Sequence, residues 1–192
     1  MRKIILLLML QVSICFAETG GAVIPPDSIY QVKSRWVDQF GQQVGLDSLA
    51  GKPVAVSMVY LSCHFACPTT IAHMKALREL LPDAMKNEVQ FVLISFDGKN
   101  DTPAAMKKYA EKHRLSYPEW RFMTSRDDAD VREFAALIDF KYKKVGKRDY
   151  EHSFGIVVLD AAGRILGSTV GTAMQEKDLV PLLVTGNRGD TK

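Results

Sequence analysis

The stretch "GKPVAVSMVYLSCHFACPTT" (residues 51–70) decides the fold class. Within it, residues 54–61 form a nearly continuous apolar run after Gly-Lys-Pro, which is typical of a buried parallel strand. Pro68 suits the first turn of a helix, and apolar residues then recur at helical spacing. We therefore predict a strand, a loop that carries Cys63 and Cys67, and a helix with Cys67 at its N-cap.

The rest of the chain alternates further strands with helices. The expected elements are two short strands in residues 32–49, a strand at 89–96, a helix opening at 101–103, a short strand at 120–124, a helix at 125–139, a basic loop at 141–148, a hairpin at 154–169 that turns at 161–163, and a closing helix at 174–185. This order predicts an α/β protein with a central mixed β-sheet flanked by helices. It is the layout of a thioredoxin-like fold with an N-terminal β-hairpin extension.

The N-terminus is typical of a secretory signal, with a basic start, an apolar run and a small-x-small cleavage pattern before Glu18. We expect residues 1–17 to be a cleaved signal peptide, 18–30 a flexible lead-in and 31–192 a single domain. An uncleaved signal would instead anchor the chain in the membrane. A lipid-modified Cys15 is disfavoured because a bulky isoleucine precedes it. The expected location is the periplasm.

Composition limits the partners and the uses of the cysteines. The formal net charge of +3 gives no reason to expect a nucleic acid partner. Without Cys15, only Cys63 and Cys67 remain, in an exported protein whose surroundings allow disulfides. A disulfide closing so short a loop would remove little chain entropy, so a structural bond is a poor use of this pair.

The cysteine pair has two chemical interpretations. The start of a helix favours the thiolate, the form that attacks disulfides and binds metals. Thioredoxin-type redox motifs have two intervening residues, whereas Cys63 and Cys67 are separated by three. The longer spacing leaves room for an ion, and two thiolates select a soft metal such as Cu(I), with Zn(II) as competitor. A closed zinc site would need four protein ligands.

A third metal ligand would have to come from elsewhere in the chain, and histidine is the natural candidate. His73 and His113 fall on expected helices, where an ordinary surface role is favoured. His64 lies between the cysteines and could approach a metal, although an exposed loop residue is the simpler interpretation. His152 opens the strand "IVVLD", and it would lie near the cysteine loop if that strand pairs with residues 54–61.

Four motifs together resemble the Sco/SenC family of copper-binding proteins. They are "CHFACP", "ISFDGKNDTP", "WRFMT" and "YEHS", in the family's order between Cys63 and Ser153. The resemblance implies a thioredoxin-like fold and one copper ion, Cu(I) or Cu(II), bound per monomer by Cys63, Cys67 and His152. The chain departs from the family pattern at His64, where proline is frequent, and at two other positions, Ser125 and Glu151, without losing a ligand.

The resemblance also implies a function. The family delivers copper to the binuclear copper centre of cytochrome c oxidase, or keeps that centre's cysteines reduced. The expected partner is therefore the oxidase copper subunit or another periplasmic copper or thiol protein. In the alternative function, Cys63 and Cys67 are the redox-active pair of a thiol–disulfide reductase. Asp97 could act as a hydrogen-bond acceptor behind the site, and the basic segment 141–148 could dock an acidic partner.

Overall fold

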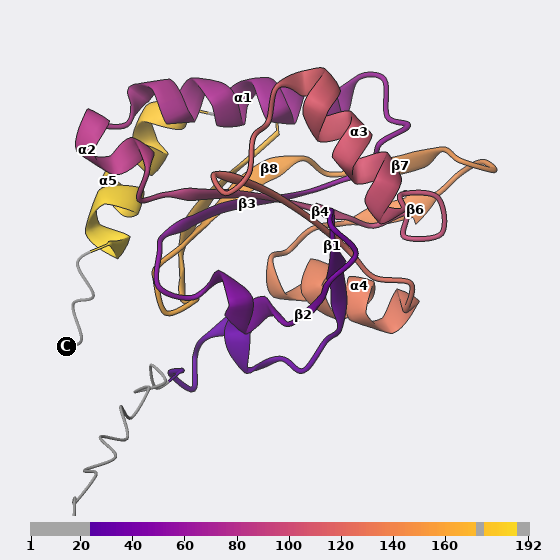
Figure 1. Cartoon of the computed structure of the whole chain (residues 1–192), viewed down its shortest axis with the longest axis horizontal. Coiled ribbons are helices and arrows are strands. Elements are labelled where there is room, and N and C mark those ends of the chain that lie inside the picture. The colour runs from indigo at the N-terminus through magenta and orange to yellow at the C-terminus, as the bar shows by residue number, and fades with distance from the viewer. Residues whose placement is uncertain (1–23, 172–174, 188–192) are drawn as a thin grey trace, which may run out of the picture.

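A seven-stranded mixed sheet organises the computed structural model, which describes residues 24–171 and 175–187 (Figure 1). In spatial order its strands are β2 (Gln43–Val44), β1 (Trp36–Asp38), β5 (Trp120–Thr124), β4 (Gln90–Ser95), β3 (Val54–Val59), β8 (Gly155–Leu159) and β9 (Ile165–Val170). The central strands β3, β4 and β5 run parallel, and the other pairings are antiparallel. The predicted mixed sheet and N-terminal hairpin are therefore confirmed.

Helices cover both faces of this sheet. They are α1 (Ala66–Leu80), α2 (Asp83–Lys86), α3 (Pro103–His113), α4 (Asp128–Leu137) and α5 (Glu176–Gly186), with 3-10 turns at Ile29–Gln31 and Leu46–Leu49. Helices α1 and α3 lie on one face and α4 on the other (Figure 1). Helix α5 packs against α1 and the β8–β9 edge. Because both faces are covered, all six residues of β3 are buried, as its apolar run predicted.

The predicted β8–β9 hairpin closes the sheet edge and also holds the N-terminal segment. Gly163 adopts φ +84° in its turn, and its carbonyl accepts a hydrogen bond from the Ile29 N–H at 3.0 Å. The Ser28 hydroxyl donates to the Ala162 carbonyl at 2.5 Å, and Ile29 and Tyr30 are buried. The expected flexible lead-in is therefore wrong for residues 28–30, which pack against the core. The expected signal peptide, residues 1–17, lies outside the described residues.

The expected basic loop at residues 141–148 is instead part of a two-stranded ribbon. Strand β6 (Tyr142–Lys144) pairs antiparallel with β7 (Tyr150–His152). The ribbon forms because its tyrosines pack on Phe96, whose ring lies 5.0 Å from that of Tyr142 and 5.3 Å from that of Tyr150. In the described part of the chain, no helix has the length and apolar composition to cross a membrane.

Candidate metal site

The buried carboxylate of Asp101 holds the loop that carries Cys63 in place. Asp101, which is 1% exposed, accepts a hydrogen bond from the Leu61 N–H at 2.9 Å and another from the Ser95 hydroxyl at 2.6 Å. Ser95 ends β4, so this carboxylate ties the loop after β3 to the neighbouring strand. The Cys63 N–H then donates to the Tyr60 carbonyl at 3.1 Å and closes a tight turn. These bonds set the position of the Cys63 sulfur.

Cys67 lies two positions further into the helix than the sequence predicted. Phe65 is the N-cap of α1, and Cys67 sits in the first turn, where its backbone N–H has no partner within the helix. That N–H donates to the Cys63 sulfur at 3.3 Å. The Tyr60 N–H donates to the Cys67 sulfur at 3.4 Å. The helix start therefore stabilises negative charge on Cys63, and the expected stabilisation of a Cys67 thiolate is wrong because the first-turn N–H is directed at the other sulfur.

His152 reaches the two sulfurs from the end of β7. Strand β8, which begins three residues later, pairs antiparallel with β3, and the His152 hypothesis depended on this arrangement. The His152 Nε2 atom lies 3.9 Å from the sulfur of Cys63 and 3.9 Å from that of Cys67. Its Nδ1 lies 2.6 Å from the carbonyl of Ser153. A carbonyl can only accept, so Nδ1 carries a proton and Nε2 is the ring nitrogen directed at the sulfurs.

The two cysteine thiols have opposite pKa shifts. The pKa of Cys63 is lowered to about 4, first by hydrogen bonding from the Cys67 thiol and then by the Cys67 N–H and His152, against the opposing effect of burial. The pKa of Cys67 is raised by its hydrogen bond to Cys63 and by burial. The pair therefore holds one proton at neutral pH, with the negative charge on Cys63. Both cysteines are free, with Cys63 8% and Cys67 1% exposed.

Three aromatic rings lie close to the imidazole. The ring of His152 lies 5.6 Å from that of Tyr60, 5.4 Å from that of Phe96 and 5.8 Å from that of Phe140. Burial and the neighbouring charge on Cys63 raise the pKa of Tyr60 to about 12, so its hydroxyl stays neutral. These contacts fix the ring plane and leave the Nε2 edge directed at the sulfurs.

Cys63, Cys67 and His152 form a group whose ligand atoms all lie within 4.8 Å of one another. The sequence model of the SCO1/SenC family matches residues 27–181 around this group. The chain belongs to the SCO1/SenC family. It is 30% identical over 151 residues to the SCO1 protein homolog of Bacillus subtilis (strain 168), covering 77% of each chain.

Solved structures agree with the fold of this Sco/SenC protein. Bradyrhizobium japonicum ScoI with copper bound superposes with a TM-score of 0.64 at 24% identity, over 79% of this chain and 95% of that chain. BsSco, a member of the Sco family of cytochrome c oxidase assembly proteins, superposes with a TM-score of 0.69 at 24% identity, over 82% and 92%. The thioredoxin-like fold expected from the resemblance is therefore confirmed.

The other histidines of this Sco/SenC protein lie outside the group. His64 is exposed in the loop. His73 pairs with Glu176 of α5, and His113 stacks on Tyr109 with ring centroids 4.1 Å apart. Within residues 24–171 and 175–187, the group with His152 is the one set of three histidine, cysteine or acidic side chains close enough to share a metal ion.

Asp97 reaches the site only through Tyr150. The Tyr150 hydroxyl donates to the Asp97 carboxylate at 3.1 Å, and Asn100 donates to both of its oxygens at 2.9 Å. Tyr150 lies two residues before His152, so this bond fixes the ribbon that carries the imidazole. Asp97 therefore positions β7 from the loop after β4. Its carboxylate, which we expected to accept a hydrogen bond behind the site, acts on His152 indirectly, through Tyr150.

Sequence reasoning missed Asp101 and the aromatic rings. The helix expected to open at residues 101–103 is capped by Thr102, whose hydroxyl accepts from the Ala105 N–H at 3.3 Å, while Asp101 bonds the cysteine loop instead. The signal that could have identified Phe96 was its place at the end of a buried strand, at the sheet edge where ligands of α/β proteins gather.

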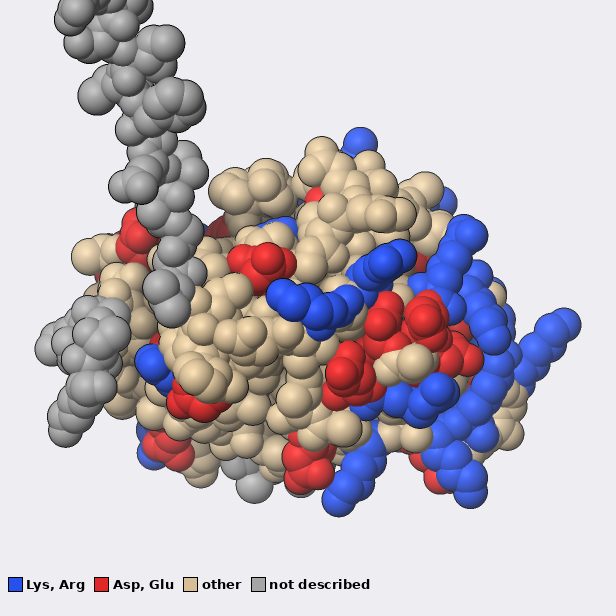
Figure 2. All heavy atoms as spheres, turned by 90° about the horizontal axis from the view of Figure 1, so that it is seen from below, with Lys and Arg blue, Asp and Glu red and all other residues tan. Residues whose placement is uncertain are grey.

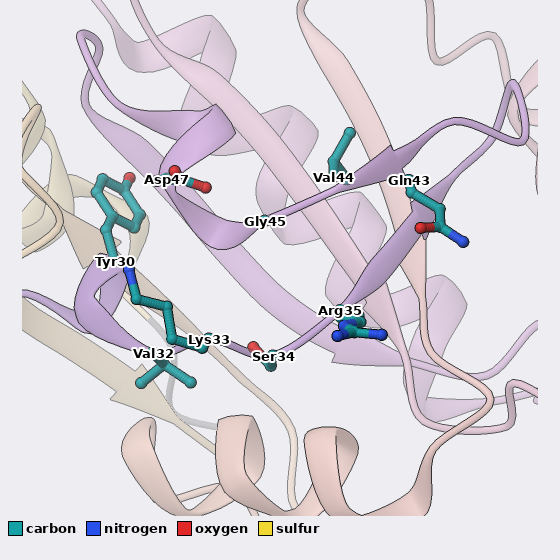
Figure 3. A pocket seen from close by; sticks show the side chains of 9 residues that line it. All are labelled: Tyr30, Val32, Lys33, Ser34, Arg35, Gln43, Val44, Gly45 and Asp47. Atoms are coloured by element: carbon teal, nitrogen blue, oxygen red, sulfur yellow. The ribbon is translucent and has the colours of Figure 1, made fainter. Parts of the chain in front are cut away.

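A separate hollow of about 270 Å³ lies at the N-terminal extension (Figure 3). It is bounded by residues 30–35 and by residues 43–47, which include β2 and the turn after it. It shares no residue with the cysteine–histidine group. The hollow beside His152 is a different one, of about 350 Å³, formed by the outer side of the β6–β7 ribbon. Solvent therefore reaches the histidine side of the group.

Proposed function

We propose that this Sco/SenC protein binds one copper ion per chain through Cys63, Cys67 and His152 and passes it to another copper protein. The observation that carries the proposal is the convergence of two sulfurs and an imidazole Nε2 within 4.8 Å. Such a soft donor set selects Cu(I) over harder ions. Four protein ligands would close a structural site, whereas three leave a position for an incoming ligand.

Transfer would occur by exchange of ligands. A thiolate of the acceptor binds Cu(I) at the open position, and the imidazole and the two sulfurs then leave in turn. No electron moves in this exchange. Protons lost by the acceptor's thiols balance those regained at Cys67 and, in acid, at Cys63. Because Cys63 already carries its negative charge at neutral pH, copper binding needs to displace a proton only from Cys67.

The acceptor we propose is the binuclear copper centre of cytochrome c oxidase, with the protein acting in the periplasm after export on residues 1–17. Membership of a family that includes BsSco, a protein of cytochrome c oxidase assembly, supports this partner. The signal-like composition of the N-terminus supports the location.

The test of binding is an anaerobic Cu(I) titration of the reduced protein against a competing chelator. We expect one Cu(I) per wild-type chain, and an affinity reduced by more than about 100-fold in Cys63→Ser, Cys67→Ser and His152→Ala. The matched control is His64→Ala, which removes an exposed histidine of the same motif and should bind as wild type does. A His152→Ala protein that binds as tightly as wild type would rule out the three-ligand site.

The unequal cysteines support a second function, reduction of a partner's disulfide. The Cys63 thiolate would attack one sulfur of that disulfide and release the other as a thiolate. Cys67, losing its proton, would then attack Cys63 and release the second thiolate, so the partner gains two electrons and this protein a disulfide. In this function His152→Ala keeps much of the activity and either cysteine variant abolishes it. Loss of copper transfer with retained reduction in His152→Ala would separate the two functions.

A further inference from the structure

Phe65 projects from between the two cysteines into solvent. Its side chain is 82% exposed, more than any other large hydrophobic side chain in the described part of the chain. Its backbone is fixed, because the Phe65 carbonyl accepts from the Thr69 N–H at 3.2 Å and from the Thr69 hydroxyl at 2.9 Å. The ring is thus held out of the fold by a rigid helix start. Covering a phenylalanine side chain stabilises a complex by about 1.5–3 kcal/mol.

The β6–β7 ribbon brings positive charge to the other side of the site. Residues 141–152 contain five lysines and arginines and two acidic residues, and all five basic side chains are exposed. Among the described residues, Lys141 is the one of these five with an ion pair, to Asp139 at 3.9 Å. Lysine and arginine side chains gather at the right-hand end of the molecule in Figure 2, the end at which Figure 1 places β6 and β7.

These two features border the same group of ligand atoms. Phe65 lies between Cys63 and Cys67 in sequence, and β7 ends at His152, whose Nε2 is 3.9 Å from both sulfurs. A protein that brings its own ligand to this group therefore meets a surface that both Phe65 and the ribbon border.

We propose that Phe65 and the basic ribbon form the docking surface for the protein that exchanges copper at this site. The partner is a protein with an apolar patch beside its copper ligands and acidic side chains around that patch. The inference rests on the proposed function and adds to it the chemistry of the partner's face. An apolar centre with a charged rim is the common anatomy of protein interfaces, and the rim steers encounter. The chain's overall charge of +3 is small, so this field is local to the ribbon.

The test is stopped-flow transfer of Cu(I) from the loaded protein to the copper-free soluble domain of the oxidase copper subunit from the same organism. Phe65→Ser should slow transfer about 10- to 100-fold with unchanged Cu(I) affinity. Its matched control is Phe40→Ser, which alters another exposed phenylalanine, in the β1–β2 turn. Lys143→Glu with Lys147→Glu should slow transfer at least about tenfold at low salt and weaken its salt dependence.

The control for the charge reversal is Lys33→Glu with Lys112→Glu, an equal change at exposed lysines outside the ribbon. If the wild type transfers copper, and Phe65→Ser and the Lys143→Glu, Lys147→Glu double variant both transfer it as fast as their control variants, the proposed docking surface is wrong and the delivery function stands. A wild type that binds copper but transfers none to this domain would overturn the proposed delivery function, and the docking surface with it. Loss of binding to phosphatidylglycerol vesicles in Phe65→Ser, without slower transfer, would assign the surface to a membrane and overturn the proposal.

Discussion

Replacing Asp101 by alanine should loosen the cysteine loop and destabilise the fold. The substitution removes the acceptor of the Leu61 N–H and of the Ser95 hydroxyl, both of which bond the same carboxylate oxygen. Each buried donor left without a partner costs about 1–3 kcal/mol. Relief of the buried carboxylate offsets part of that loss, since burial is the largest cause of the raised pKa of Asp101. We expect the free energy of unfolding to fall by about 2–4 kcal/mol.

Asp101→Asn is the matched control, because one amide oxygen can accept both hydrogen bonds. We expect it to stay within about 1 kcal/mol of wild type. The raised pKa of Asp101 also determines how its contribution to stability changes with pH. That contribution is fully present below the unfolded pKa of about 4 and is lost as pH rises through the folded pKa, so Asp101→Asn should gain stability relative to wild type as pH rises above about 4.

Urea unfolding of the reduced, copper-free protein measures these differences through the fluorescence of buried Trp36 and Trp120. The same Asp101→Ala protein should bind Cu(I) about 10- to 100-fold more weakly, because the loop that places Cys63 has lost its anchor. The argument fails if Asp101→Ala is as stable as wild type. It fails equally if Asp101→Asn is destabilised as much as Asp101→Ala.

Three other expected outcomes test the site and the fold. Ultraviolet absorbance of the reduced protein should show one thiolate, that of Cys63, appearing near pH 4, and His152→Ala should move this midpoint upward; a midpoint above neutrality would contradict the assigned charge. Tyr150→Phe, which removes the bond to Asp97, should lower stability by about 0.5–1.5 kcal/mol and speed amide exchange in β6 and β7, measured by mass spectrometry. Gly163→Ala forces a side chain into the left-handed region and should cost at least about 1–2 kcal/mol in urea unfolding, so wild-type stability would refute that strain.

The sheet could be predicted from the sequence because its central strands are buried on both faces and therefore read as continuous apolar runs. The β6–β7 ribbon could not, since its strands are three residues long and lysines surround its tyrosines. What stabilises the ribbon is contact with Phe96, some fifty residues earlier in the chain. That contact exists only after the sheet has formed, so no pattern within residues 142–152 predicts the ribbon.

The residues of the candidate site also differ in whether local sequence or only the fold reveals them. The position of the two cysteines after a buried strand followed directly from local pattern. The residues alone left His152 open, because its nearness depends on β8 pairing with β3, and the family resemblance was needed to favour it. Asp101 could not be identified, because an acidic residue before Thr-Pro equally predicts a helix cap. Only the fold shows that the neighbouring threonine caps α3 and that the carboxylate turns inward.

The three candidate ligands are held with unequal strength, and this bears on how the site can release a metal. Cys67 belongs to a 15-residue helix, and the loop of Cys63 is tied to β4 through Asp101. His152 ends a three-residue strand whose outer side faces solvent, and its ribbon is tied down by the rings on Phe96 and by the Tyr150 hydroxyl. Because two packed elements fix the sulfurs and a lightly attached ribbon carries the imidazole, we infer that the imidazole is the ligand that can move away first. The exchange measurement on Tyr150→Phe tests this order, since an unchanged ribbon would mean that it is held as firmly as the sulfurs.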